Sequence, residues 1–438
     1  MKKLFAVLFA IMIVSPAYAD TFAPVYYDQT NSTLYQDGGS GPSAVPTVGP
    51  AGPTGPTGPA GAIGPAGATG PAGTPGFLTN TRLAKTTAYT LASGDNGDTV
   101  ALGGSAFYTL TFGAASGYPT GYGVMVVNED SGRAKALSIS GIGTVMLWPL
   151  QSCIVYAQNS AWQTQGCGAR WRFPGNETFY ADATNGSDSN DCLAAGTGNA
   201  CATIGHVLAV IRADADSQGN TAFVQLADGT YNESLYEFGD ILGGSQNIQI
   251  TGDATTPTNT VVKAVRGSFA ITSTDYGVLT LNHFAINCNS NGGGGMGGVQ
   301  PSQFGIVDLN AVTFLDCTGK HDIDVENGGH VNFTEPVTIS GNAAGFIYTY
   351  GLGSHVDMAG QAITFSAAVT SSYFLEAVAQ SQIMVNGATF VNPGNLTGQK
   401  WIAADLSYIE LGSATIPGTV AGTPAVSTLS SDGSYVSP

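Results

Sequence analysis

The second half of the chain carries a short pattern in which apolar residues alternate with variable ones. The pattern occurs at 278–281, 306–309, 330–333, 355–358, 382–385 and 408–411. The second and fourth residues are apolar in every copy, so the pattern predicts short strands with one buried face. Successive copies start 24 to 28 residues apart. We interpret each copy as one rung of a solenoid, because a single rung cannot bury its apolar face without a neighbour.

The first and third residues of each copy then line an outer face of the solenoid. Neighbouring strands lie about 4.8 Å apart, which places His330 beside His355 and Asn332 beside Asp357. Polar and aromatic groups on such a face suit sugar hydroxyls. The predicted ligand-binding residues are His330, Asn332, His355, Asp357, Tyr408 and Glu410. Among them, His330, His355 and Asp357 also offer a base with an orienting carboxylate, although an exposed polar ladder is the simpler interpretation.

Two further patterns precede these rungs. Short β-rich runs that alternate with Gly, Asn and Asp turns predict a small antiparallel β-domain over 77–170. The residues Ile204, Val207, Leu208 and Ile211 have the spacing of one helical stripe. We expect this helix to cover the open end of the solenoid, where unpaired strand edges would otherwise invite association.

The first 19 residues form a predicted signal peptide. Lys2 and Lys3 precede an apolar run at 4–14, and the motif Ala17-Tyr18-Ala19 supplies the small residues that a signal peptidase recognises. The apolar run is shorter than the roughly 20 residues that span a bilayer, so we predict a secreted, extracellular or cell-surface protein without membrane insertion. Residues 20–48 are rich in Ser, Thr, Gly and Pro without any period, which predicts a flexible segment.

A different composition begins at Gly49. Glycine occupies every third position from Gly49 to Gly76, and proline often follows it. Only glycine fits at the axis of three wound polyproline-II chains, so the tract 49–76 predicts a collagen-like triple-helical stalk. A triple helix needs three chains, and we therefore predict a homotrimer.

Two motif groups resemble known families. The runs from Tyr108 to Phe112 and from Ala161 to Gln163 resemble a β-domain common in phage tail-fibre and tail-associated proteins. The motif Tyr180-Ala-Asp182 and the run from Leu226 to Tyr231 resemble the entrance to right-handed parallel β-helices of the pectate-lyase-like superfamily, as found in secreted bacterial proteins and phage tailspikes. The second resemblance implies that a β-helix occupies 171–438. The expected fold is therefore all-β: a right-handed parallel β-helix preceded by the small antiparallel domain and the stalk.

Composition narrows the classes of function. The chain has 13 Lys and Arg against 30 Asp and Glu, a net charge of −17, so a nucleic-acid backbone or an anionic membrane would repel it. Only 10% of the residues are charged while 43% are hydrophobic, which excludes a chain that is disordered throughout.

Six cysteines form an even set in a chain predicted to reach an oxidising compartment. Several pairings are formally open. Order along the chain favours three disulfides: Cys153 with Cys167, Cys192 with Cys201, and Cys288 with Cys317.

The clearest candidate for catalysis is a run of alternating acids. Asp322, Asp324 and Glu326 are predicted to share one strand face about 7 Å apart, within the range of roughly 6.5 to 9.5 Å that an inverting glycosidase uses. A solvated strand face is the competing interpretation. The pectate-lyase-like resemblance would imply calcium-binding acids and an Arg or Lys base, but only Lys320 lies beside an acid cluster. The resemblance therefore supports the fold more than a lyase reaction.

Oxygen ligands for a metal occur near the start of the predicted β-helix. The candidate Ca²⁺ ligands are Asp182, Asp188, Asn190 and Asp191. Their spacing does not match an EF-hand, and a turn-rich loop explains the same residues. Ca²⁺ is the one cofactor that the sequence suggests.

Three hypotheses of function follow. The leading one is a secreted, trimeric, fibre-like adhesin whose β-helix head contacts a carbohydrate or cell-surface receptor. The second is a polysaccharide-degrading enzyme, either pectate-lyase-like or a glycosidase depolymerase, that uses the acids at 322–326. The third is a structural protein derived from a phage tail fibre or tailspike.

Overall fold

The computed structural model describes residues 25–28, 33–37, 42–44, 81–236, 247–265, 268–288, 297–418 and 433–437. The predicted signal peptide (1–19) and the predicted collagen-like stalk (49–76) lie outside the described residues. Within 20–48, three short strands pair as an antiparallel sheet: β1 (Val25–Asp28), β2 (Thr33–Asp37) and β3 (Pro42–Ala44). The flexibility expected of this segment stays a prediction. The tyrosine and β-branched residues of these strands have high β-propensity.

The β-domain that follows has two sheets. One sheet has the order β12 (Ala161–Gln165), β11 (Ser152–Gln158), β8 (Gly123–Asn128), β6 (Thr99–Leu102), β4 (Arg82–Lys85). The other has the order β10 (Gly143–Leu147), β9 (Lys135–Ile139), β7 (Thr109–Phe112), β5 (Tyr89–Thr90). Short 3₁₀ turns lie at η1 (Ser93–Asp95) and η2 (Ala115–Gly117).

The predicted antiparallel arrangement of this domain is correct only for its later strands. The pairs β8–β11, β11–β12 and β9–β10 are antiparallel, whereas β4–β6, β6–β8, β5–β7 and β7–β9 are parallel. The chain passes alternately between the two sheets from β4 to β9, so successive strands of each sheet run in the same direction. A period of two predicts a strand with one buried face but carries no information about strand direction.

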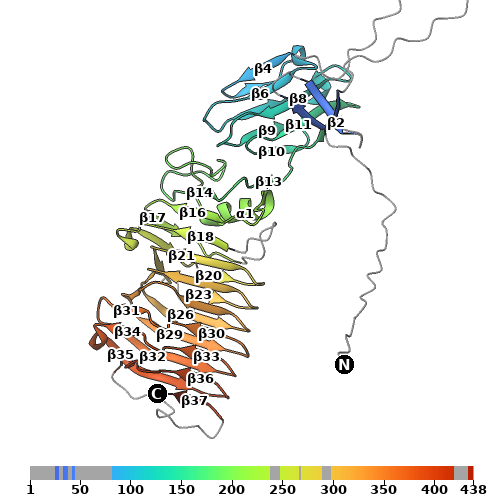
Figure 1. Cartoon of the computed structure of the whole chain (residues 1–438). Helices are drawn as coiled ribbons and strands as arrows, with labels where there is room; N and C mark the ends of the chain where they lie inside the picture. The colour runs from blue at the N-terminus through green and yellow to red at the C-terminus, as the bar shows by residue number, and fades with distance from the viewer. Residues whose placement is uncertain are drawn as a thin grey trace, which may run out of the picture.

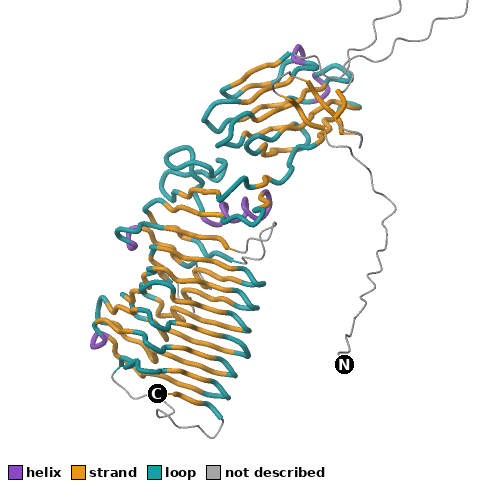
Figure 2. The backbone as a smooth tube through the Cα atoms, viewed as in Figure 1, coloured by secondary structure: helices purple, strands orange, loops and turns teal. Residues whose placement is uncertain are grey.

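The rest of the chain forms a right-handed parallel β-solenoid, in which each regular turn visits three sheets (Figure 1). The ten-stranded sheet contains, among the described residues, β14 (Glu177–Ala181), β16 (Ala222–Leu226), β18 (Asn247–Thr251), β21 (Val278–Asn282), β24 (Ile306–Asn310), β27 (His330–Phe333), β30 (His355–Asp357), β33 (Gln382–Met384), β36 (Tyr408–Glu410) and β37 (Tyr435–Ser437). The seven-stranded sheet contains, within the same described ranges, β17 (Gly229–Asn232), β19 (Thr260–Lys263), β22 (Ala285–Asn287), β25 (Thr313–Phe314), β28 (Val337–Ile339), β31 (Ala362–Phe365) and β34 (Thr389–Val391). The six-stranded sheet contains, again in the described part of the chain, β20 (Phe269–Ser273), β23 (Gly297–Pro301), β26 (Cys317–Glu326), β29 (Ala343–Tyr350), β32 (Val369–Val378) and β35 (Leu396–Ala403). The turns between them are stacked along the sides of the solenoid (Figure 2), and η3 (Pro257–Asn259) and η4 (Pro393–Asn395) are short 3₁₀ turns.

The six repeats that the sequence indicates are six consecutive strands of the ten-stranded sheet. They pair in parallel and in register, so that Val278, Ile306, His330, His355, Gln382 and Tyr408 form one ladder. The second and fourth residues of every repeat are buried, as predicted. The burial of these apolar pairs on every turn supplies the continuous core that a solenoid needs.

A single α-helix among the described residues, α1 (Ile204–Asp214), lies at the N-terminal end of the solenoid (Figure 1). Its four predicted stripe residues are buried against the first strands of the solenoid. Thr203 caps the helix by accepting a hydrogen bond from the His206 amide at 3.1 Å. Beside the helix, β13 (Trp171–Arg172) pairs with β15 (Ala215–Asp216). The helix thus covers the end of the solenoid, where the strand edges of the first turn would otherwise be exposed.

All three predicted disulfides are present: Cys153–Cys167, Cys192–Cys201 and Cys288–Cys317. Disulfides are typical of proteins that fold in an oxidising compartment. Within the described ranges, the structure contains no helix long and apolar enough to cross a membrane.

Candidate functional site

The predicted ligand-binding residues lie on the outer face of the ten-stranded sheet, and all six are half-buried. His330 pairs with His355 and Asn332 with Asp357, as the repeat predicts. The imidazole rings of the two histidines lie 5.6 Å apart between centroids. Tyr408 lies three strands away from His330, which corresponds to about 14 Å at 4.8 Å per strand. The predicted residues therefore form two groups on one face rather than one compact site.

Side chains on this face largely satisfy one another. Asn332 Nδ2 donates to Asp308 Oδ1 at 2.8 Å, and the Ala359 amide donates to Asp357 Oδ1 at 2.8 Å. Burial, and then the neighbouring His330, lower the pKa of His355, which favours its neutral form. Asp357 thus stabilises a local turn. The side chains of this ladder bind one another and the backbone, as expected of a polar surface with a structural role.

The predicted acid run is split between the core and the outer surface. Asp324 and Glu326 lie on the outer face of the six-stranded sheet, but Asp322 points into the core, so the expectation of one shared face is wrong for Asp322. The cause is a bend in the strand at which two adjacent residues both point inward. The same step recurs on the next turns as the buried pairs Phe346–Ile347 and Phe374–Leu375.

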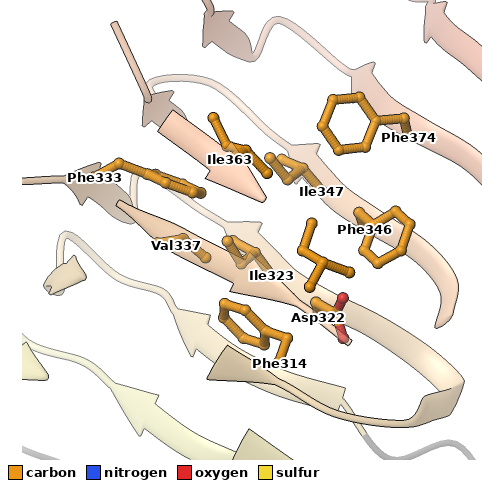
Figure 3. A pocket seen from close by; sticks show the side chains of 10 residues that line it. Phe314, Asp322, Ile323, Phe333, Val337, Phe346, Ile347, Ile363 and Phe374 are labelled. Carbon is orange, nitrogen blue, oxygen red and sulfur yellow. The ribbon is translucent and has the colours of Figure 1, made fainter. Parts of the chain in front are cut away.

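Asp322 occupies the ladder position that phenylalanine fills on later turns. Figure 3 shows its carboxyl group among Phe314, Ile323 and Phe346, beside a cavity of about 10 Å³. Within the described part of the chain, neither carboxyl oxygen has a hydrogen-bond partner. Burial, and then the charge of Asp316, raise the pKa of Asp322 well above its ordinary value. The raised pKa favours the neutral form of Asp322, and because the side chain points into the core, it lies out of reach of a polymer at the surface.

The outer face of the six-stranded sheet brings together a second set of residues on three consecutive strands. We call it the acid–tyrosine cluster, and it consists of His321, Asp324, Glu326, Tyr348, Tyr373 and Glu376. The Nδ1 atom of His321 lies 3.1 Å from Asp324 Oδ2, and its Nε2 atom lies 3.3 Å from the Tyr373 hydroxyl. A carboxylate only accepts hydrogen bonds, so Nδ1 carries a proton.

Acidic side chains lie at both ends of this contact. Glu326 lies beside Asp324, close enough to share a hydrogen bond when one of the two carboxyl groups is protonated, and Glu376 lies beside Tyr373. A row of polar groups therefore runs from Glu326 through Asp324, His321 and Tyr373 to Glu376, across strands β26 and β32.

A glycine makes the contact between His321 and Tyr373 possible. On β29, which lies between the two strands, Gly345 pairs with both His321 and Tyr373. A Cβ atom at Gly345 would lie 2.5 Å from Tyr373 Cε2 and 2.7 Å from His321 Cδ2. The missing side chain therefore leaves the space in which the two rings meet across an intervening strand.

Tyr348 lies at the centre of the cluster. Its ring stacks on His321 with centroids 4.7 Å apart and an interplanar angle of 13°, and Tyr350 continues the stack at 6.3 Å. Asp324 and Glu376 flank Tyr348 in register on the two neighbouring strands. Burial, followed by the charges of Glu376 and Asp324, raises the pKa of Tyr348 to about 12. Its hydroxyl therefore stays protonated at neutral pH and can donate a hydrogen bond.

Two acids of the cluster retain unused acceptor capacity. Asp324 is 3% exposed, and its Oδ1 atom has no hydrogen-bond donor among the described residues. The same holds, within the described ranges, for the buried Oε2 atom of Glu376. Burial, and then the charge of Asp324, raise the pKa of Glu326. Glu326 and Asp324 can satisfy each other only when one proton is shared between the two carboxyl groups, because two carboxylates have no donor.

The predicted metal ligands face separate partners. Asp182 accepts from the amides of its own turn, at Thr184 and Asn185, both at 2.9 Å. Asp188 accepts from the amides of Ala202 and Thr203. The carboxylate oxygens are thus used to shape the loop.

The remaining two candidates also have structural partners. Asn190 Nδ2 donates to the Ala200 carbonyl at 2.8 Å, and Asp191 pairs with Arg133. In the described part of the chain, the one group of three ligand atoms close enough for a metal is Cys192, Cys201 and His206, whose cysteines are joined in a disulfide. The structure therefore does not gather the four predicted residues into one coordination sphere.

Sequence reasoning missed four members of the cluster: His321, Tyr348, Tyr373 and Glu376. A signal for two of them was present, since Tyr348 and Glu376 follow Asp324 at intervals of 24 and 28 residues, the spacing of the repeats. The approach of His321 to Tyr373 had no such signal, because it depends on the space above Gly345.

No known family, curated protein or solved structure matches the chain. The fold and the acid–tyrosine cluster are therefore the basis for an inference of function.

Proposed function

We propose that this chain is a secreted, trimeric, fibre-like adhesin whose solenoid binds carbohydrate through the acid–tyrosine cluster. The observation that carries the proposal is the combination of unused buried acceptors, on Asp324 and Glu376, with the tyrosine between them. Sugars offer hydroxyl donors to carboxylates and apolar ring faces to aromatic side chains. Both kinds of contact are available here within a width of three strands, about 10 Å.

A single site of this kind binds weakly. Each side-chain hydrogen bond contributes only about 0.5 to 1.5 kcal/mol. Three heads on one stalk would raise the avidity for a surface by roughly 100-fold or more. The glycine period at 49–76 is the sequence feature that supports three chains.

An apolar edge of the solenoid also supports a trimer. At the turns from the six-stranded to the ten-stranded sheet, four large apolar side chains are each more than half exposed: Tyr276, Phe304, Leu352 and Leu406. The rings of Tyr276 and Phe304 stack with centroids 5.1 Å apart, and Phe304 lies over Gly328 of the next turn. We call these four residues the apolar edge. The turns at 327–329 and 379–381, which lie between Phe304 and Leu352 and between Leu352 and Leu406, carry no large apolar side chain. Exposed apolar side chains that recur along one edge can form a contact surface, and a second copy of the chain is the partner that the glycine period predicts.

The experiment compares two faces of the solenoid. The secreted protein and two variants, Tyr348→Ala and Tyr408→Ala, are tested against a panel of immobilised polysaccharides. We expect Tyr348→Ala to weaken binding by about tenfold, which corresponds to about 1.4 kcal/mol, and Tyr408→Ala to leave it unchanged. A loss with Tyr408→Ala alone would assign binding to the ten-stranded sheet instead. If the wild-type protein binds no polysaccharide, the proposal fails.

A specific observation favours one second candidate, a polysaccharide hydrolase. The raised pKa of Glu326 suits a general acid, and Glu376 lies on the same face, two strands away from Asp324 in register. Release of reducing ends by the wild-type protein but not by Glu326→Gln, with binding retained, would support the hydrolase.

A further inference from the structure

We propose that the acid–tyrosine cluster recognises a glycan that carries a protonated amino group. This inference rests on the proposed carbohydrate binding and narrows its ligand class from sugars in general to amino sugars with a free amine. The argument comes from the charge balance of the cluster, its unused acceptors and its shared proton.

The cluster has an excess of negative groups. Asp324, Glu326 and Glu376 lie on one face, and the one basic side chain in salt-bridge contact with them within the described ranges is His321, beside Asp324. Lys320 lies over the ring of Phe269, 4.6 Å from its centroid, and its charge also acts on Glu326, so it offsets part of this excess. The net charge of the whole chain, −17, also attracts cations. Such a field favours a cation and disfavours a polyuronate.

The shape of the cluster suits an ammonium group in particular. Asp324 and Glu376 lie in register on the two strands that flank the strand of Tyr348, and each has a buried oxygen without a hydrogen-bond donor among the described residues. A buried acceptor left without a donor costs about 1 to 3 kcal/mol. An ammonium group supplies three donors and a positive charge, and charge-assisted hydrogen bonds are roughly twice as strong as neutral ones. The exposed ring of Tyr350, next to Tyr348, adds cation–π attraction.

The proton shared by Glu326 and Asp324 competes with such a ligand. An ammonium group that donates to Asp324 removes the need for that proton, so binding releases it. Because the pKa of Glu326 is raised, the proton is held more tightly than by an ordinary carboxyl group. We therefore expect affinity for the amine to fall as the pH falls towards the raised pKa of Glu326, although the ligand's amine is more fully protonated there.

The test uses two ligands with the same backbone: a fully deacetylated glucosamine hexamer and its N-acetylated counterpart. Binding to the full secreted protein is measured by titration calorimetry at pH 6 in two buffers with different ionisation enthalpies. We expect at least tenfold tighter binding of the free amine, together with proton release. Glu376→Gln should remove most of this preference.

The matched control is Glu335→Gln, which removes one exposed carboxylate between β27 and β28 and changes the net charge by the same amount. If Glu335→Gln weakens binding of the amine as much as Glu376→Gln does, the attraction is a general effect of charge and the inference is overturned. Equal binding of the two hexamers, or binding only of other neutral glycans, would overturn the proposed preference for a free amine. The proposal that the cluster binds carbohydrate would then still stand. Failure to bind any glycan would refute both proposals.

Discussion

Arg133 of the β-domain and Asp191 of the first solenoid turn form a bidentate ion pair. The guanidinium donates through Nη2 to Oδ1 at 2.8 Å and through Nε to Oδ2 at 2.9 Å, and the Ala134 amide adds a third hydrogen bond. Both side chains are buried, with 6% and 0% exposed. Next to the pair, Trp148 stacks on Trp171 with centroids 5.6 Å apart. These contacts join the β-domain to the solenoid.

The Arg133–Asp191 pair gives the first prediction. Arg133→Ala leaves the Asp191 carboxylate buried without its partner, and the expected loss is about 3 to 5 kcal/mol in the free energy of unfolding. The matched control is Arg82→Ala, which removes the exposed pair with Glu129 and should cost at most about 1 kcal/mol. Urea unfolding of both variants is the measurement. Equal losses in the two variants would contradict the structural role of Asp191.

Much of the solenoid could be predicted from the sequence, because the apolar second and fourth residues of each rung determine both the burial and the register. The direction of the strands in the β-domain could not, since alternation is the same in parallel and antiparallel sheets. The bend at Asp322 was also hidden: alternation predicts an outward side chain, and only the adjacent apolar pairs Phe346–Ile347 and Phe374–Leu375 on later turns reveal the inward step. The acid–tyrosine cluster could be predicted only in part, because side chains of three turns build it.

The second prediction concerns the glycine beneath the cluster. Gly345→Ala should push the rings of His321 and Tyr373 apart and weaken carbohydrate binding by about tenfold or more, because the added Cβ has no free space. The control is Gly394→Ala, where a Cβ meets nothing within 4 Å. Binding and thermal unfolding are measured on both variants. Unchanged binding by a folded Gly345→Ala protein would show that the contact between the two rings is not needed.

The third prediction follows from the buried Asp322. Its pKa is raised in the folded state, so the folded protein holds a proton that the unfolded chain releases above about pH 4. The stability that this proton contributes is therefore complete at low pH and is lost as the pH rises towards the folded-state pKa.

Asp322→Asn removes this titration while it keeps the shape of the side chain. We expect the difference in unfolding free energy between the variant and the wild type to change with pH, with the variant gaining relative stability from about pH 4 to pH 7. Urea midpoints across this range measure the effect, and Glu410→Gln on the outer surface is the control. A difference that stays constant with pH would mean that Asp322 has an ordinary pKa.

The last prediction places the apolar edge at the contact between chains. If the edges of three copies meet, a cysteine at Leu352 should be cross-linked between chains by a short bis-maleimide, since Leu352 is the most exposed residue of the edge, at 75%. The matched control is Val391→Cys, an exposed apolar residue at the end of β34, on the corner between the seven-stranded and six-stranded sheets. Light scattering of the same samples gives the number of chains. If the trimer is cross-linked through Val391→Cys and not through Leu352→Cys, the trimer proposal stands, but the chains meet at the corner near Val391 instead of at the apolar edge. A monomer would refute both the trimer and the contact between apolar edges, because no second copy would then cover those side chains.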